Sequence, residues 1–127
     1  MQFITPSTIS TPKGHYSPGV VHQGIVYVAG QLPINASGEV QLKSIAAQTA
    51  LCMHNIEQIL IAANSSLQLI LKVNVFVSDI ALWPDINAEY CKIMGSHKPA
   101  RIVIPCNSLN YGCGVEIDCI AAVKEPG

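Results

Sequence analysis

Arg101, the single arginine of this 127-residue chain, is the residue whose type and position most directly suggest binding chemistry. It stands at the front of an apolar, β-branched run that continues to Pro105. A guanidinium is a planar fork of N–H donors that can hold a carboxylate through two parallel hydrogen bonds, and it stays charged when partly desolvated. Three interpretations remain open from the residue alone: an anchor for a small carboxylate, a structural ion pair with Asp118 or another carboxylate, or a surface residue at the end of a loop.

Glu116 is the second candidate because it lies inside an apolar stretch, VEIDCIAAV. A carboxylate is costly to bury unless it is paired or serves as an acid or base with a raised pKa, and exposure at a sheet edge is the plainer interpretation. If the strands that carry Arg101 and Glu116 are antiparallel neighbours across the turn NYGCG, both side chains converge on one end of a cleft. Such a pair would suit a small keto or imino acid.

Other kinds of reactive site find little support in the sequence. Cys106 and Cys113 could be nucleophiles, but no histidine with a partnering carboxylate stands beside either, and a lone cysteine is more often a small core residue. The four histidines lack metal-ligand spacing, so we expect no metal site. The glycine-rich YGCG lies between expected strands, and we interpret it as a turn, which leaves no cofactor motif.

The elements that must position these residues follow from hydrophobic periodicity. Alternation predicts strands, and a three-to-four-residue repeat predicts helices, the second of them capped by Asp79 and carrying Pro84 in its first turn. The predicted order is ββαβαββ, an α+β fold with one sheet and both helices on one face. Two short strands are expected within 20–29, around His22 to Gly24, and further strands at 72–79, 100–106 and 115–123. The helices are expected at 43–64 and from the cap Asp79 to near 95–99.

Composition predicts a single domain over residues 1–127 that associates with copies of itself. Half of the residues are apolar, 12% are charged, and the formal net charge is −1, which argues against disorder and against a nucleic-acid partner. The small charged fraction indicates that other subunits cover part of the surface. The expected open sheet face carries Phe76, Glu116 and Asp118, a mixture that a symmetric oligomer would bury.

The sequence also predicts a cytoplasmic protein without membrane contact. Its longest uncharged stretch, 58–71, is too short and too polar to span a bilayer, and its first residues lack the basic and apolar regions of a secretory signal. Five cysteines without a C-x-x-C pair fit reduced thiols better than disulfides.

Several stretches resemble a known family, the RidA (YjgF-like) reactive imine/enamine deaminases. They are GHYSPGVVHQGIVYVAGQLPIN, NAEY, and KPARIVIP followed by GVEIDCIA, and the resemblance covers the chain from about Gly14 to Val123. The most specific pieces are the tripeptide PAR and the VEI strand at the family's spacing.

This resemblance implies a chorismate-mutase-like subunit that forms a homotrimer around a central barrel, with three clefts between subunits. The implied reaction is cofactor-free hydrolysis of 2-imino acids such as 2-iminopropanoate and 2-iminobutanoate to 2-oxo acids and ammonia. By likeness, Arg101 would hold the substrate carboxylate, Glu116 would orient or activate water, and Tyr16 would close the cleft. Backbone groups at Gly30 and Val103 would help to fix the carboxylate, with Asn87 a further contact.

Two departures from the family pattern bear on substrate range. Ala29 stands where members often have Ser, and Val103 where they often have Cys, so two polar groups at the cleft wall are replaced by apolar ones. A non-catalytic protein that binds a small carboxylate in the same cleft, or a regulatory protein, is the alternative function. The retained Glu116 favours catalysis, because carboxylate binding alone needs no second negative charge.

Overall fold

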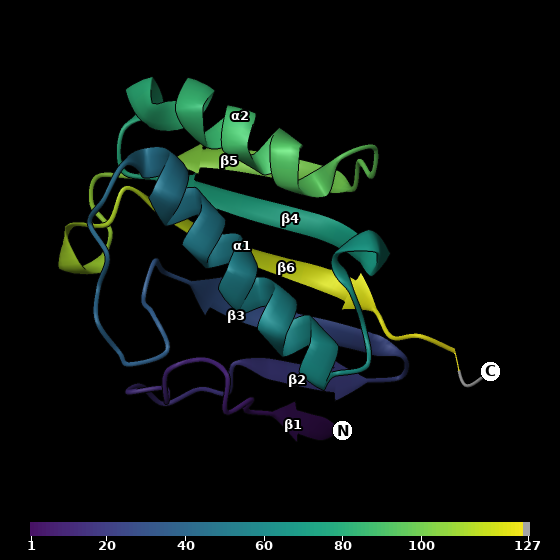
Figure 1. Cartoon of the computed structure of the whole chain (residues 1–127). Helices are drawn as coiled ribbons and strands as arrows, with labels where there is room; N and C mark the ends of the chain where they lie inside the picture. Colours follow the sequence, from purple (N-terminus) through teal and green to yellow (C-terminus); the bar gives the residue numbers. More distant parts are fainter. Residues whose placement is uncertain (126–127) are drawn as a thin grey trace.

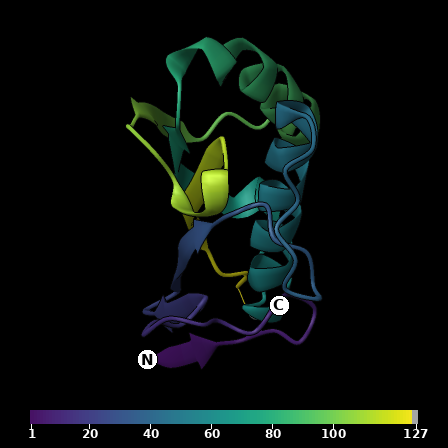
Figure 2. The same cartoon turned by 90° about the vertical axis from the view of Figure 1, so that its left-hand side faces the viewer.

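The fold is one six-stranded sheet with two helices, seen in a computed structural model that describes residues 1–125. The strand order is β1-β2-β3-β6-β4-β5, and all neighbours are antiparallel except β4 and β5, which are parallel. Both helices lie on the same face of the sheet (Figures 1 and 2). The elements are β1 Gln2–Ile4, β2 Gly19–His22, β3 Ile25–Gln31, α1 Ile45–Ala62, β4 Ile70–Val77, α2 Trp83–Met94, β5 Ala100–Pro105 and β6 Val115–Ala122.

The predicted order of elements is confirmed, with one strand added at the start of the chain. Strand β1 is three residues long and pairs only with β2 at the edge of the sheet. So short a strand shows no alternation by which a sequence could reveal it. The expected domain, 1–127, extends two residues past the part that the structure describes.

The two faces of the sheet differ in burial as the alternation predicts. In β6, Val115, Ile117, Cys119 and Ala121 are buried against the helices, while the intervening residues are half-buried on the open face. Strand β4 follows the same rule, with Val73, Val75 and Val77 buried in the core. The core therefore lies between this face and the apolar sides of α1 and α2, and its largest fully buried side chains include Met53, Ile56, Ile59, Leu60 and Ile86.

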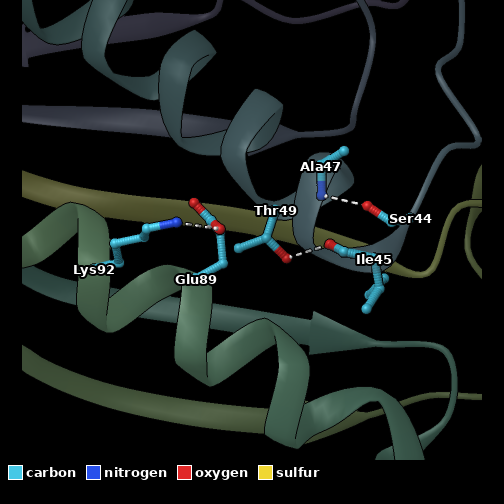
Figure 3. A network of polar contacts seen from close by, with 6 residues as sticks. All are labelled: Ser44, Ile45, Ala47, Thr49, Glu89 and Lys92. Carbon is cyan, nitrogen blue, oxygen red and sulfur yellow. Dashed lines mark hydrogen bonds and ion pairs between the residues drawn. The ribbon is translucent and has the colours of Figure 1, made fainter.

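Helix α1 starts at Ile45, two residues after the expected start at 43, because Ser44 caps it. The hydroxyl oxygen of Ser44 accepts a hydrogen bond from the backbone N–H of Ala47 at 3.1 Å, and the Thr49 hydroxyl donates to the Ile45 carbonyl at 2.8 Å (Figure 3). The first contact gives a partner to one of the N–H groups of the first turn, which have none inside the helix, and the second satisfies the Thr49 hydroxyl.

Helix α2 differs in detail from the expectation at its start. Asp79 caps a 3₁₀ turn, Ile80–Leu82, by accepting from the Ala81 N–H, and α2 continues from that turn with Pro84 near its first position. Lys92 lies 3.8 Å from Glu89, one turn away on the same helix; Lys92 is exposed and Glu89 is half-buried (Figure 3).

The parallel pairing of β4 with β5 decides how the candidate residues are placed. Helix α2 returns the chain so that β5 runs beside β4, and residues 106–114 then carry it over the end of β4 to β6. Both Pro105, at the end of β5, and Val115, at the start of β6, pair with Val77. The expectation that the strands of Arg101 and Glu116 are neighbours is therefore wrong, because β4 lies between them.

Candidate functional site

Arg101 lies on the helix side of the edge strand β5 and is held by α2. It pairs with Val73, whose side chain is buried in the core, so the guanidinium faces the helix layer. Its Nη1 donates to the Asn87 Oδ1 at 2.9 Å, and its Cζ lies 4.8 Å from the ring centre of Trp83 and 5.0 Å from that of Tyr90. The side chain is fixed by these three residues.

No carboxylate neutralises this guanidinium within residues 1–125. The only ion pair of that range joins Lys92 and Glu89. Asp118, the partner that the sequence suggested for a structural ion pair, instead accepts a hydrogen bond from Asn74 at 2.7 Å. Arg101 is thus an exposed cation with a fixed geometry and several unused N–H donors, which is what a carboxylate anchor requires.

Glu116 lies on the open face of the sheet, half-buried between β3 and β4. Burial, and next the charge of Asp118, raises the pKa of its carboxyl above the usual range. It pairs with Phe76, and none of the described cations forms an ion pair with it. A carboxyl whose pKa is raised accepts a proton more readily than an ordinary glutamate does, so this environment favours acid–base chemistry.

Gly30 makes room for that carboxyl. A Cβ added at Gly30 would lie 2.6 Å from the Glu116 Oε2 and 3.2 Å from its Cδ. Gly30 is not among the residues with positive φ, so the backbone does not require glycine there. The missing side chain therefore serves the placement of the carboxylate directly against the backbone of β3.

A pocket of about 500 Å³ opens beside Glu116 and Gly30. Tyr16 from the N-terminal loop, Tyr111 from the loop before β6, and Ala29 belong to its wall. Tyr16 is 55% exposed, and its ring lies against Gly14, where a Cβ would approach it to 2.9 Å. The expected grouping of Tyr16, Gly30 and Glu116 is present in one chain, and Arg101 and Asn87 form a separate group at the α2–β5 edge.

The two groups are too far apart in one chain for a small molecule to touch both. Arg101 and Glu116 pair with positions three residues apart on β4, Val73 and Phe76, and lie on either side of that strand. Neighbouring strands are about 4.8 Å apart and rise about 3.3 Å per residue. The two Cα atoms are therefore separated by roughly 10 Å across the sheet, which is two strand spacings, and by roughly 10 Å along the strands, which is three residues. They also face opposite sides of the sheet, since Val73 is buried under the helices and Phe76 is on the open face.

Val103 lies two residues after Arg101 on the same edge strand. It pairs with Val75, and its side chain packs against the core. The outer side of an edge strand presents backbone groups without partners in its own sheet, so β5 offers such groups beside the guanidinium.

Three of the five cysteines have the properties of core residues, while Cys106 is half-buried and Cys91 is exposed. Cys52, Cys113 and Cys119 are buried, and burial raises the pKa of each, that of Cys119 to about 12. The Cys106 Sγ donates to the Val77 carbonyl at 3.3 Å. Among residues 1–125 no group of three or more His, Cys, Asp or Glu side chains could hold a metal ion, and no described helix is long and apolar enough to cross a membrane.

Trp83 and Tyr90 were not among the residues selected from the sequence as parts of a site. Trp83, Asn87 and Tyr90 are spaced i, i+4 and i+7, which places them on one side of α2. This spacing on a predicted helix, just before the strand that carries the only arginine, could have indicated that these three residues belong to the site.

Comparison with known proteins places nearly the whole chain in one family. The family model described as Endoribonuclease L-PSP matches residues 7–123. Protein HMF1 of Saccharomyces cerevisiae is 33% identical over 87% of this chain and 85% of its own length. The putative regulator AldR of Lactococcus lactis is 35% identical over 93% of this chain and 96% of its own length.

Solved structures agree with the fold. Yeast Mmf1 matches with a TM-score of 0.94 at 31% identity, over 97% of this chain and 98% of its own. The YjgF gene product of E. coli matches with a TM-score of 0.91 at 29% identity, over 98% of this chain and 100% of its own. E. coli TdcF with bound serine matches with a TM-score of 0.91 at 26% identity, over 98% of this chain and 100% of its own. The expected chorismate-mutase-like α+β class is confirmed by this agreement.

Proposed function

We propose, on the premise that this chain belongs to the L-PSP (YjgF/RidA) family, that it hydrolyses small 2-imino acids to 2-oxo acids and ammonia. The observation that carries the proposal is a pair of opposite charges that have no ion-pair partner among residues 1–125. Arg101 is a fixed guanidinium, and Glu116 is a pocket carboxyl whose pKa is raised. Together they provide the two groups that this reaction needs, an anchor for a carboxylate and a group that transfers protons.

The two groups belong to one site when the α2–β5 edge of one protomer meets the Glu116 pocket of the next. We propose a homotrimer in which the open sheet faces pack around a central barrel. The open face supports this assembly because Phe3, Tyr27 and Ile102 on it are 65%, 48% and 48% exposed in the single chain. Apolar area of this kind is normally covered in an oligomer.

The chemistry follows from the two charges. Arg101 binds the carboxylate of the imino acid and holds its C2 beside the pocket. Glu116 takes a proton from water as the water oxygen bonds to C2, and the imine nitrogen is protonated, which gives a carbinolamine. The hydroxyl proton then passes through Glu116 to the amino nitrogen, and as the C=O bond forms the C–N bond breaks, so that neutral ammonia departs with the bonding electrons and leaves the 2-oxo acid. No redox partner or cofactor is needed, because only water adds and only ammonia leaves.

The remaining residues have supporting roles in this proposal. Asn87 fixes Arg101, and Tyr16 closes the pocket over the substrate. Backbone groups at Gly30 and on the outer side of β5 at Val103 complete the binding of the carboxylate. Ala29 and Val103 leave apolar surface where many relatives carry a hydroxyl and a thiol, so we expect an apolar substituent on C3 to be favoured over a hydroxyl.

A coupled assay tests the activity. A PLP-dependent dehydratase generates 2-aminoacrylate from serine or 2-aminocrotonate from threonine, and the assay asks whether this protein accelerates release of the 2-oxo acid. Arg101→Ala is expected to lose nearly all of the acceleration while the assembly persists. Loss of a desolvated charged anchor costs about 2 to 5 kcal/mol, or roughly 30-fold or more in rate. Wild-type turnover in Arg101→Ala would count against the proposal.

Mixing two inactive variants tests whether the site joins two protomers. Arg101→Ala and Glu116→Gln chains are unfolded together, refolded as mixed trimers, and assayed. If each site takes one residue from each of two neighbours, random mixing restores about a quarter of the sites. If each site were built within one chain, no mixed trimer would contain an intact site, and activity would stay at the background of the separate variants.

Carboxylate binding without catalysis is the second candidate. Two relatives favour it by their names: a putative regulator from Lactococcus lactis and a TdcF structure with bound serine. Saturable binding of 2-oxobutanoate without acceleration in the coupled assay would support this function over hydrolysis. The family description also names an endoribonuclease, but a net charge of −1 offers little attraction for RNA phosphates, so an RNA-cleavage arm of the assay is expected to be negative.

We also propose a cytoplasmic location, a compartment in which five unpaired thiols stay reduced. Two yeast relatives are named as mitochondrial proteins. Cell fractionation, with one marker protein for the cytoplasm and one for the mitochondrion, distinguishes the two locations.

A further inference from the structure

We propose that Trp83 and Tyr90 are positioning residues that hold the Arg101 guanidinium in its carboxylate-binding orientation. This inference rests on the proposed function for its kinetic test, but it also makes a binding prediction that needs no catalysis. The three side chains Trp83, Asn87 and Tyr90 are here called the arginine clamp. They lie on one side of α2 and contact the guanidinium by two rings and one amide oxygen.

The clamp restrains the arginine without using up its binding capacity. Aromatic rings interact with a guanidinium through its planar faces, whereas its N–H donors point outward in the plane. Of the five donors, one is occupied, by the Asn87 Oδ1 at 2.9 Å. An ion pair would hold the side chain equally well, but it would neutralise the charge and consume the donors that a carboxylate needs.

Restraint of this kind raises affinity because it raises the share of molecules that are ready to bind. A free arginine at an edge strand samples many rotamers, and the apparent dissociation constant increases as the competent share falls. Arg101 and its neighbours Ala100 and Ile102 on β5 are exposed, so little else among the described residues restrains the arginine side chain. The clamp therefore acts on substrate binding, and a loss of the clamp should raise KM more than it lowers kcat.

The Tyr90 ring, and not its hydroxyl, is the working part. Tyr90 is 5% exposed, and its hydroxyl has no hydrogen-bond partner within residues 1–125. A buried hydroxyl without a partner costs stability and does nothing for Arg101, while the ring lies against the guanidinium. Tyr90→Phe keeps the ring and removes the hydroxyl, which makes it a matched control.

Trp83 is the only tryptophan of the chain, so its fluorescence reports directly on the clamp. An anion that binds Arg101 changes the charge 4.8 Å from the indole ring. We expect the emission of the wild-type protein to change saturably on titration with 2-oxobutanoate, with N-acetyltryptophanamide as the control for collisional quenching. Arg101→Lys, which keeps the charge but not the planar fork, should lose the saturable change.

The kinetic arm compares three variants in the coupled assay. Trp83→Leu is expected to raise KM about tenfold with a smaller change in kcat, which corresponds to one strong cation–π contact. Trp83→Phe restores an aromatic face and should recover KM to within about threefold of wild type, as should Tyr90→Phe. A merely structural role for Trp83 would lower the amount of folded trimer without changing the KM of what remains, and that result would overturn the proposal.

The outcomes separate this inference from the proposed function. A saturable emission change that Arg101→Lys abolishes, without any imine hydrolysis, leaves the clamp supported and refutes the deaminase. Imine hydrolysis by the wild type, with an unchanged KM in Trp83→Leu, refutes the clamp and leaves the deaminase standing. An unchanged wild-type emission at 2-oxobutanoate concentrations that inhibit turnover would also refute the clamp.

Discussion

If the chain catalyses the proposed hydrolysis, replacing Gly30 by alanine tests whether the position of the Glu116 carboxylate determines the rate of that reaction. The new methyl group would lie 2.6 Å from the Glu116 Oε2, whereas ordinary contacts begin at about 3.4 Å, so the carboxylate must retreat by about 0.8 Å. Misplacement of a reacting group by about 1 Å can cost roughly 100-fold in rate. We therefore expect Gly30→Ala to lower kcat between about 10- and 100-fold.

Stability should change little in the same variant. The clashing atom is the end of a flexible side chain, and the φ angle of Gly30 is not in the positive region. Alanine is otherwise at least as well tolerated as glycine within a strand. Thermal unfolding and the oligomeric state of Gly30→Ala are therefore expected to match the wild type, which separates an effect on catalysis from an effect on folding.

A double-mutant cycle tests whether the clash with the Glu116 carboxylate causes the expected loss of activity in Gly30→Ala. Glu116→Asp shortens the side chain by one methylene and removes the clash with an alanine at position 30. Gly30→Ala should then cost much less activity in the Glu116→Asp background than in the wild type, so the two effects are not additive. Additive effects, or a Gly30→Ala enzyme that keeps kcat within twofold, would refute the claim that the space above Gly30 is reserved for the carboxylate.

Two further substitutions test packing and charge. Gly114→Ala places a Cβ 2.5 Å from the Ile45 Cδ1 and 3.2 Å from the Leu82 Cδ1, so we expect chemical denaturation to show a loss of about 1 to 3 kcal/mol. Glu116→Gln is expected to be more stable than the wild type at pH 8 but not at pH 4, because burial and then Asp118 raise the folded-state pKa. A carboxyl whose pKa is higher in the folded than in the unfolded state contributes stability to the wild type at a pH below the unfolded-state pKa. The wild type loses this contribution as the pH rises through the folded-state pKa, whereas the neutral glutamine has no such loss. A variant less stable than wild type at pH 8 would contradict this cause.

The faces of the sheet could be predicted because burial alternates residue by residue. Val73, Val75 and Val77 point to the core and Asn74 and Phe76 to the open face, as their spacing indicates. The second helix was also predictable in its buried stripe, including Ile86 and Tyr90. Local periodicity carries this information because it reflects which side of each element loses contact with water.

Strand order could not be predicted in the same way. The strands at 100–105 and 115–122 follow one another in sequence, and consecutive strands are usually neighbours. Here the loop 106–114 crosses the end of β4 and delivers β6 to the far side of that strand. Nothing in the local pattern of the loop indicates this crossing, so Arg101 and Glu116 were expected to be closer within one chain than they are.

The candidate site was predictable by residue type more than by arrangement. The lone arginine and the strand glutamate stood out, while the clamp around Arg101 depends on how α2 lies over β5. Trp83 in particular reads as an ordinary apolar residue at the start of a helix, and its contact with the guanidinium becomes evident only from the packing of the two elements.

The separation of Arg101 and Glu116 by β4 has a consequence for the time course of biosynthesis. Under the proposed mechanism, a newly made chain can fold completely and still be inert, because each half of its reactive centre waits for a neighbour. Catalytic competence then begins with the meeting of subunits and not with folding, and each chain contributes to two centres, one along each of its two flanks.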